Sequence, residues 1–154
     1  MESLIFNKRI VAFCIICFCA VGILFAQTAS EIETLLKVSA VTYGQAAGFV
    51  LRAADAVKTS NAKDAFNLAI EKNWLPKNVS ADSQARLDVI SMLFMKSFGL
   101  KGGLFYSLFK NPHYAYRELA ARKAFKGKSG PNNAVSGDQL LFITNRVLSI
   151  AEGE

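Results

Sequence analysis

Cysteine is scarce in this 154-residue chain, and all of it lies near the N-terminus. None of the three cysteines, Cys14, Cys17 and Cys19, follows the small-residue pattern of a lipoprotein acylation site. Beyond position 19 the chain therefore has no thiol for a disulfide, a thiolate zinc site or a nucleophile. Such a domain has to be stabilised by its hydrophobic core, and about 128 residues after the N-terminal segment are enough to bury one.

Residues that carry catalytic chemistry are also few. His113 is the single histidine, and one histidine without a cysteine partner does not make a zinc site. No serine lies in a nucleophile-elbow pattern, and Lys101-Gly102-Gly103 lacks the preceding strand and the Gly-Lys-Ser/Thr ending of a phosphate loop. We therefore expect no enzyme activity, no cofactor and no metal.

Signals for β-strands are missing as well. The chain has no Asn-Gly hairpin and no sustained alternation of apolar and polar residues. Apolar residues recur instead at steps of three and four, which is the period of one helical face. The predicted fold class is all-α.

The N-terminal segment has the composition of a signal peptide. Lys8 and Arg9 precede seventeen uncharged residues, Ile10 to Ala26, and a polar run follows from Gln27. We expect residues 1–26 to be a signal peptide cleaved after Ala26. The alternative is an uncleaved membrane anchor, although seventeen residues lie at the short edge of what spans a bilayer. The predicted location is the periplasm or cell envelope of a bacterium, with membrane contact only through this segment if it is uncleaved.

Positive charge dominates the rest of the chain. Without residues 1–26, 16 basic and 11 acidic side chains remain, a net charge of +5. Between Lys96 and Lys128 there are eight basic residues and one acid, Glu118. Outside the cytoplasm, such a stretch favours anionic glycans, wall polymers or phospholipid head groups over nucleic acid as partners. The alternative is a solvated face that keeps the protein soluble.

Two segments predict helix starts by the same chemistry. Thr42 with Gln45, and Ser136 with Gln139, have the spacing of a capping box, in which a hydroxyl and an amide bond reciprocally to backbone N–H groups. Between them, apolar positions predict a further helix over about 84–97, with Asp82 or Ser83 as its cap.

A shift of fifty residues aligns much of the chain with itself. It places Phe66 on Tyr116, Ile90 on Leu140 and Leu93 on Ile143, which indicates a repeated supersecondary unit. Each unit consists of a helix (about 62–73, then 112–124), a polar loop and a second helix (about 84–97, then 137–150). A capping box at Ser30 and Glu33 predicts a shortened first helix over 31–38. We expect one all-α domain over 27–154, with helix–loop–helix units at about 30–58, 62–98 and 112–150 packed as a compact bundle.

The start of the middle helix resembles a known motif. Ala85-Arg86-Leu87-Asp88 is similar to the Thr-Arg-Ala-Glu-like motif that opens the second helix of the S-layer homology repeat, and Ala69-Ile70 is similar to the Ala-Ile segment before its loop. The resemblance covers about 41–150. The first and last copies, at Thr42 and Ser136, keep a cap and lack the arginine. The fifty-residue shift aligns Arg86 with Ser136, whereas the family motif aligns Ala85 with it.

The resemblance implies a bundle of three units that attaches non-covalently to wall polysaccharide, with the motif arginine holding an anionic glycan. Only Arg86 inherits that role. We therefore predict a non-catalytic binding or scaffolding module of the cell envelope that contacts cell-wall glycan. The predicted ligand-binding residues are Arg86, Asp88, Lys101, Arg117, Lys126 and Lys128. The alternative for Arg86 is a surface ion pair with Asp88 or a loop carboxylate.

Aromatic residues are densest between Phe98 and Tyr116. They are Phe98, Phe105, Tyr106, Phe109, Tyr114 and Tyr116. Because large apolar side chains are usually buried, we expect them to fill the seam between units. The alternative is a surface that stacks on sugars or touches a membrane, with Lys101, Lys110 and Arg117 beside it. As an alternative function, an aromatic surface would join the protein to a partner in an envelope complex.

Overall fold

The computed structural model describes residues 29–58, 61–127 and 129–153. In these ranges the regular structure is helical and there is no strand, so the all-α prediction is confirmed. The predicted signal segment 1–26 and Lys128 lie outside the described residues. The chain forms two compact units, Met1–Leu35 and Leu36–Glu154. No helix within the described ranges is long and apolar enough to cross a bilayer.

The described part of the first unit belongs to a helix over residues 29–36. Ser30 lies inside this helix, where its carbonyl accepts a hydrogen bond from the Thr34 hydroxyl at 2.8 Å. The prediction that Ser30 caps the helix start is therefore wrong.

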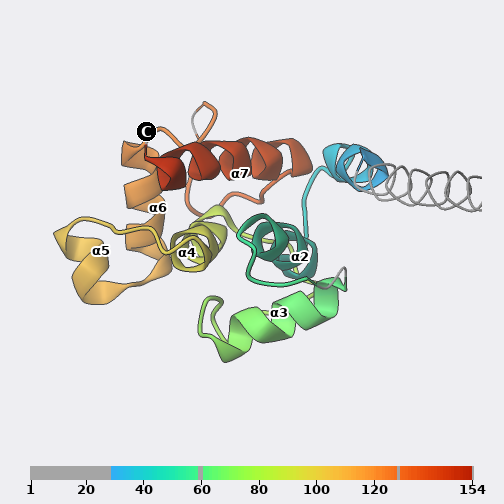
Figure 1. The fold of residues 1–154 in the computed structure, drawn as a ribbon, viewed down its shortest axis with the longest axis horizontal. Helices are drawn as coiled ribbons and strands as arrows, with labels where there is room; N and C mark the ends of the chain where they lie inside the picture. Colours follow the sequence, from blue (N-terminus) through green and yellow to red (C-terminus); the bar gives the residue numbers. More distant parts are fainter. Residues whose placement is uncertain (1–28, 59–60, 128, 154) are drawn as a thin grey trace, which may run out of the picture. The chain divides into compact units, whose positions relative to one another are not determined.

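The described residues of the second unit form the helices that Figure 1 labels. They are α2 (Tyr43–Ala53), α3 (Ala62–Glu71), α4 (Leu87–Ser97), α5 (Leu104–Phe109), α6 (Pro112–Ala121) and α7 (Gly137–Glu152). Helix α3 packs on α2 and α6 packs on α4, while α2 also contacts α4 and α7. This arrangement is the compact helical bundle expected from the apolar periodicity.

Helix α4 lies at the centre of the bundle. Every residue from Leu87 to Met95 is buried, including Ile90, Leu93 and Phe94. A helix that is apolar on all sides is stable only when other elements surround it. Each of these large side chains contributes about 1.5–3 kcal/mol by leaving water.

Three short segments meet in a closed ring of backbone hydrogen bonds. The Val41 N–H donates to the Val135 carbonyl at 2.8 Å, the Val135 N–H to the Ala85 carbonyl at 3.0 Å, and the Ala85 N–H to the Val41 carbonyl at 2.8 Å. Two isolated bridges, between Thr42 and Gln84 and between Arg86 and Ala134, flank the ring. Each of the three segments thus donates one backbone N–H to a second segment and accepts one from the third.

A helix begins directly after each ring residue. The N-caps are Thr42 for α2, Arg86 for α4 and Ser136 for α7. Arg86 and Ser136 are thus both N-caps, and Ala85 and Val135 each precede one and lie in the ring.

The capping boxes differ in outcome. At α2 the box is complete, because the Thr42 hydroxyl accepts from the Gln45 N–H at 3.2 Å and the Gln45 Oε1 accepts from the Thr42 N–H at 3.0 Å. At α7 the Ser136 hydroxyl accepts from the Gln139 N–H, but the Gln139 side chain donates to the Ser129 hydroxyl at 3.0 Å. The Gln139 side chain therefore bonds to the Ser129 hydroxyl in the preceding loop and not to the backbone N–H of Ser136, its partner in a capping box.

The start of α4 corrects the prediction of Asp82 or Ser83 as its cap. The helix begins at Leu87 and has no side-chain cap. The Leu87 N–H donates to the Asn133 carbonyl at 3.0 Å and the Asp88 N–H to the Pro131 carbonyl at 2.9 Å. Carbonyls of a distant loop thus satisfy the N–H groups that a helix start leaves without an internal partner.

The same type of contact occurs at the start of α2. The Tyr43 N–H donates to the Ser83 carbonyl at 3.0 Å and the Gly44 N–H to the Ala81 carbonyl at 2.8 Å. At α7, the Gly137 N–H donates to the Val38 carbonyl at 2.9 Å. The loop before each of these helices therefore caps another of the three.

Backbone features of the two longer helix–loop–helix segments correspond at a spacing of fifty. Asn61 and Asn111 are the N-caps of α3 and α6. Asn73 and Lys123, both with a left-handed backbone at φ 54° and 55°, follow the ends of these helices. The left-handed residue stops each helix two or three residues before the predicted end.

The aromatic stretch does not form a buried seam, which corrects that expectation. Tyr106 is buried, whereas Phe105 and Phe109 are exposed. Helix α5 has six residues and packs on α6, so the residues on its other faces remain in solvent.

Candidate functional site

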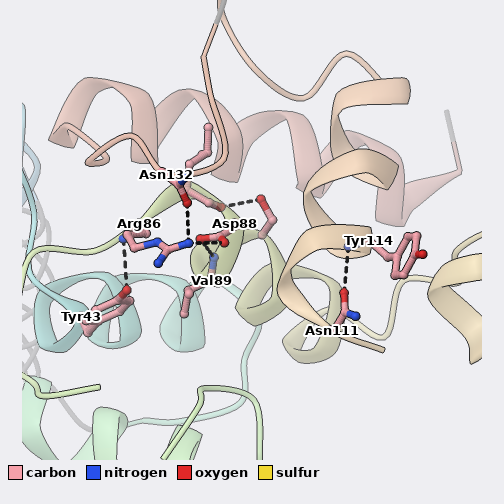
Figure 2. Close-up of polar contacts among 9 residues, drawn as sticks. Tyr43, Arg86, Asp88, Val89, Asn111, Tyr114 and Asn132 are labelled. Carbon is pink, nitrogen blue, oxygen red and sulfur yellow. Dashed lines mark hydrogen bonds and ion pairs between the residues drawn. The ribbon is translucent and has the colours of Figure 1, made fainter. Parts of the chain in front are cut away.

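Arg86 connects three parts of the second unit (Figure 2). Its backbone N–H donates to the Tyr43 hydroxyl of α2 at 3.3 Å. Its Nη2 donates to Asp88 Oδ2 at 2.7 Å and to Asn132 Oδ1 at 2.5 Å. The guanidinium is therefore held between the start of α4 and the loop before α7.

The ion pair between Arg86 and Asp88 is asymmetric. The Arg86 side chain is 50% exposed and that of Asp88 is 11% exposed. The other oxygen of Asp88, Oδ1, accepts from the Val89 N–H at 2.8 Å. An almost buried carboxylate thus anchors a half-exposed guanidinium, so the ion pair with Asp88 given as the alternative for Arg86 is present in the structure.

Tyr43 supports Arg86 as a neutral phenol. Burial raises its pKa above the usual value of 10.0, while the hydrogen bond from the Arg86 N–H and the Arg86 charge act in the opposite direction. The hydroxyl therefore stays protonated at neutral pH and its oxygen accepts the Arg86 N–H.

The structure brings only two of the predicted ligand-binding residues together, Arg86 and Asp88. Lys101, Arg117 and Lys126 are exposed elsewhere. Lys101 lies in the loop before α5, where its carbonyl accepts from Arg122, Arg117 lies on α6, and Lys126 follows α6. No described contact joins these three to Arg86, and Lys128 lies outside the described residues.

Sequence reasoning missed Asn132 and Tyr43. Asn132 lies in a polar loop, whose composition predicts a turn and which has no periodic pattern of apolar residues. Tyr43 follows the Thr42 cap and resembles any first helical residue. No signal in the sequence points to either residue, because their contacts with Arg86 join positions 43 and 46 residues apart in the chain.

A pocket lies on the same loop as Asn132. Its volume is about 530 Å³, and its lining residues are Tyr116, Ala120, Lys123, Phe125, Gly127, Ser129 and Gly130. The rings of Tyr116 and Phe125 stack at 5.2 Å, and the Tyr116 hydroxyl donates to the Ser129 carbonyl. Residues 129–132 thus connect an aromatic pocket with the anchored guanidinium.

Within the described ranges, no group of three or more histidine, cysteine or acidic side chains could hold a metal ion. Comparisons of the chain with protein-family models, with curated proteins and with solved structures found no match. The functional interpretation therefore depends on the residues and geometry described above.

Proposed function

We propose that this protein is a non-catalytic binding module of the bacterial cell envelope that contacts cell-wall glycan through Arg86. The observation that carries the proposal is the half-exposed guanidinium held by the almost buried carboxylate of Asp88 and the amide of Asn132. Export through the predicted signal peptide 1–26 is part of this proposal.

The ring of backbone hydrogen bonds supports the proposal that the chain is such a module. Val41, Ala85 and Val135 each precede a helix start and bond to one another in a cycle. A compact bundle of three units is what the resemblance to S-layer homology repeats implies. In this proposal, the chain is a diverged member of that class of fold.

The chemistry of the Arg86 cluster suits a glycan. A guanidinium supplies planar N–H donors, and the neighbouring carboxylate and amide supply acceptors. Sugar hydroxyls need both, and the N–H groups of Nε and Nη1, which these two bonds do not use, can donate to oxygens of acidic wall polymers. Because Asp88 and Asn132 already hold Arg86 in place, binding costs less side-chain entropy than at a free surface arginine.

Only one of the three helix starts carries this cluster. Thr42 and Ser136 occupy the equivalent positions at α2 and α7 and have no guanidinium. A single site predicts modest affinity, to which exposed cations such as Lys126 add long-range attraction for anionic polymers.

Sedimentation with purified, membrane-free cell-wall sacculi tests the proposal. The full-length chain in mild detergent should sediment with the sacculi, and Arg86→Ala should reduce the bound fraction about tenfold. Arg86→Lys, which keeps the charge but loses the planar fork, should also weaken binding.

Arg117→Ala is the matched control, because it removes an exposed arginine from α6. Because no described contact joins Arg117 to Arg86, this variant should lose only the long-range attraction of one exposed cation, far less than Arg86→Ala loses. Equal retention of Arg86→Ala and Arg117→Ala, or no retention of the unaltered chain, would contradict the proposal.

A further inference from the structure

Helix α5 exposes an apolar cluster that the proposed glycan site does not use. Leu104 is 72% exposed, Phe105 57%, Leu108 67% and Phe109 57%. These four side chains lie on a helix of six residues at one edge of the second unit (Figure 1). We call them the α5 cluster. The other described large apolar side chains that are exposed, Ile32, Leu36 and Phe142, belong to other helices.

The α5 cluster is held in place. The rings of Phe105 and Phe109 stack on Tyr114 of α6 at 5.6 and 5.3 Å. Ahead of the helix, the Gly103 N–H donates to Glu118 Oε1 at 2.8 Å. The buried Tyr106 fixes the opposite face of α5. The apolar side chains are therefore presented to solvent by a packed helix.

Exposed cations flank α5 in the chain. Lys101 precedes the helix, and Lys110 is its C-cap; both side chains are exposed. The acid nearest in sequence, Glu118, accepts from the Gly103 N–H and lies 3.9 Å from Arg122. The helix that carries the cluster thus has a lysine at each end.

The size of the α5 cluster distinguishes between a protein partner and a lipid bilayer as its occupant. Its four side chains expose on the order of 500 Å², the size of the largest apolar patch on a typical monomer, which is often functional. A stable protein interface buries about 800 Å² on each partner and is depleted of charge at its core. Shallow insertion into a bilayer needs only a few apolar side chains together with cations facing anionic lipid.

We propose that the α5 cluster inserts into the head-group region of an anionic phospholipid bilayer, with Lys101 and Lys110 binding lipid phosphates. This contact is additional to any made by the N-terminal segment. It would place the second unit against the membrane surface, independently of glycan binding at Arg86.

The test needs a local signal, because the apolar segment 10–26 could itself hold the full chain on vesicles. In the full-length chain carrying Trp74→Phe, Leu108→Trp provides a single tryptophan in the α5 cluster. Phe142→Trp in the same background is the matched control, because Phe142 is an exposed apolar residue outside the cluster. The probe is quenching by brominated acyl chains in vesicles of phosphatidylglycerol and phosphatidylcholine.

Tryptophan at position 108 should lose about half of its emission or more on the anionic vesicles, and tryptophan at 142 much less. Adding Lys101→Glu and Lys110→Glu should abolish most of the quenching at 108 while the chain stays on the vesicles. Vesicles of phosphatidylcholine alone should quench position 108 less than the anionic vesicles do.

Three outcomes would overturn the proposal. The first is equal quenching at 108 and 142, or none at 108 on vesicle-bound chain. The second is full quenching at 108 after the two Lys→Glu changes, which would remove the role of anionic lipid. The third is a doubled mass without lipid together with blue-shifted emission at 108, which would assign the cluster to a second copy of the chain.

Discussion

Nη2 of Arg86 lies 2.7 Å from Oδ2 of Asp88, and the carboxylate is the more buried partner. Loss of Arg86 and loss of Asp88 therefore have different consequences. Removing Arg86 leaves a carboxylate inside the bundle without its cation, whereas removing Asp88 leaves a guanidinium that already reaches water. The pair stabilises the α4 start and orients the proposed glycan contact at the same time.

Arg86→Ala should lower the free energy of unfolding by about 1–2 kcal/mol, because Asp88 then lacks its charged hydrogen-bond donor. The exposed half of the guanidinium keeps the value below that of a fully buried pair. Urea unfolding monitored by circular dichroism measures the change. Arg117→Ala should stay within about 0.5 kcal/mol of the unaltered chain. Equal losses in the two variants would show that Asp88 does not depend on Arg86.

The burial of Tyr43 predicts that the stability of the fold depends on pH at the alkaline end. Burial raises its pKa in the folded state above 10.0, so the unfolded chain releases the phenol proton first as pH rises. The folded state then binds more protons, and stability contributed by neutral Tyr43 is complete below pH 10.0 and decreases above it. Tyr43→Phe should reduce this decrease, as measured by unfolding between neutral pH and pH 11. An unchanged alkaline slope would argue against a buried, neutral Tyr43.

Gly44→Ala separates helix propensity from packing. Propensity alone predicts that alanine stabilises α2 by about 0.5–1 kcal/mol. The added Cβ, however, would lie 3.2 Å from the Ala81 carbonyl oxygen, a backbone atom that accepts the Gly44 N–H at 2.8 Å. That oxygen cannot move without lengthening the hydrogen bond that caps α2. We expect a net loss of about 1 kcal/mol in thermal or urea unfolding, and a gain in stability would refute this explanation of the glycine.

Two substitutions in α5 should differ sharply in their effect on the free energy of unfolding. Leu108→Ser removes an exposed side chain and should change the free energy of unfolding by no more than about 0.5 kcal/mol. Tyr106→Ala removes a buried aromatic ring and should cost about 3 kcal/mol. Both are measured by urea unfolding without lipid. A large loss for Leu108→Ser would mean that the α5 cluster is covered in the folded protein.

Local chemistry explains how much of the fold is predictable. The hydroxyl–amide spacing at Thr42 and Gln45 predicts the start of α2 correctly, because both groups bond within four residues of chain. At α7 the same spacing predicts the helix start but not the partner of the Gln139 side chain. The α4 start was misplaced because Arg86 lacks a side-chain cap and the carbonyls that replace it belong to residues 131 and 133.

The candidate site was predictable only in part. The motif resemblance selected Arg86 and Asp88, two residues apart in one helix start. Lys101, Arg117 and Lys126 were grouped with them because they share a charge, and charge patterning says nothing about which face a residue occupies. Burial of the aromatic stretch was expected from residue type, but α5 is too short to cover its own apolar side chains.

From the sequence by itself follow the helical class and the starts of α2 and α7, since these depend on periodicity and on bonds between near neighbours. Only the tertiary structure decided that Val41, Ala85 and Val135 form a ring, that Asn132 completes the Arg86 cluster and that α5 is exposed. Each of these depends on contacts between residues far apart in the chain, where packing of the whole bundle selects the partner.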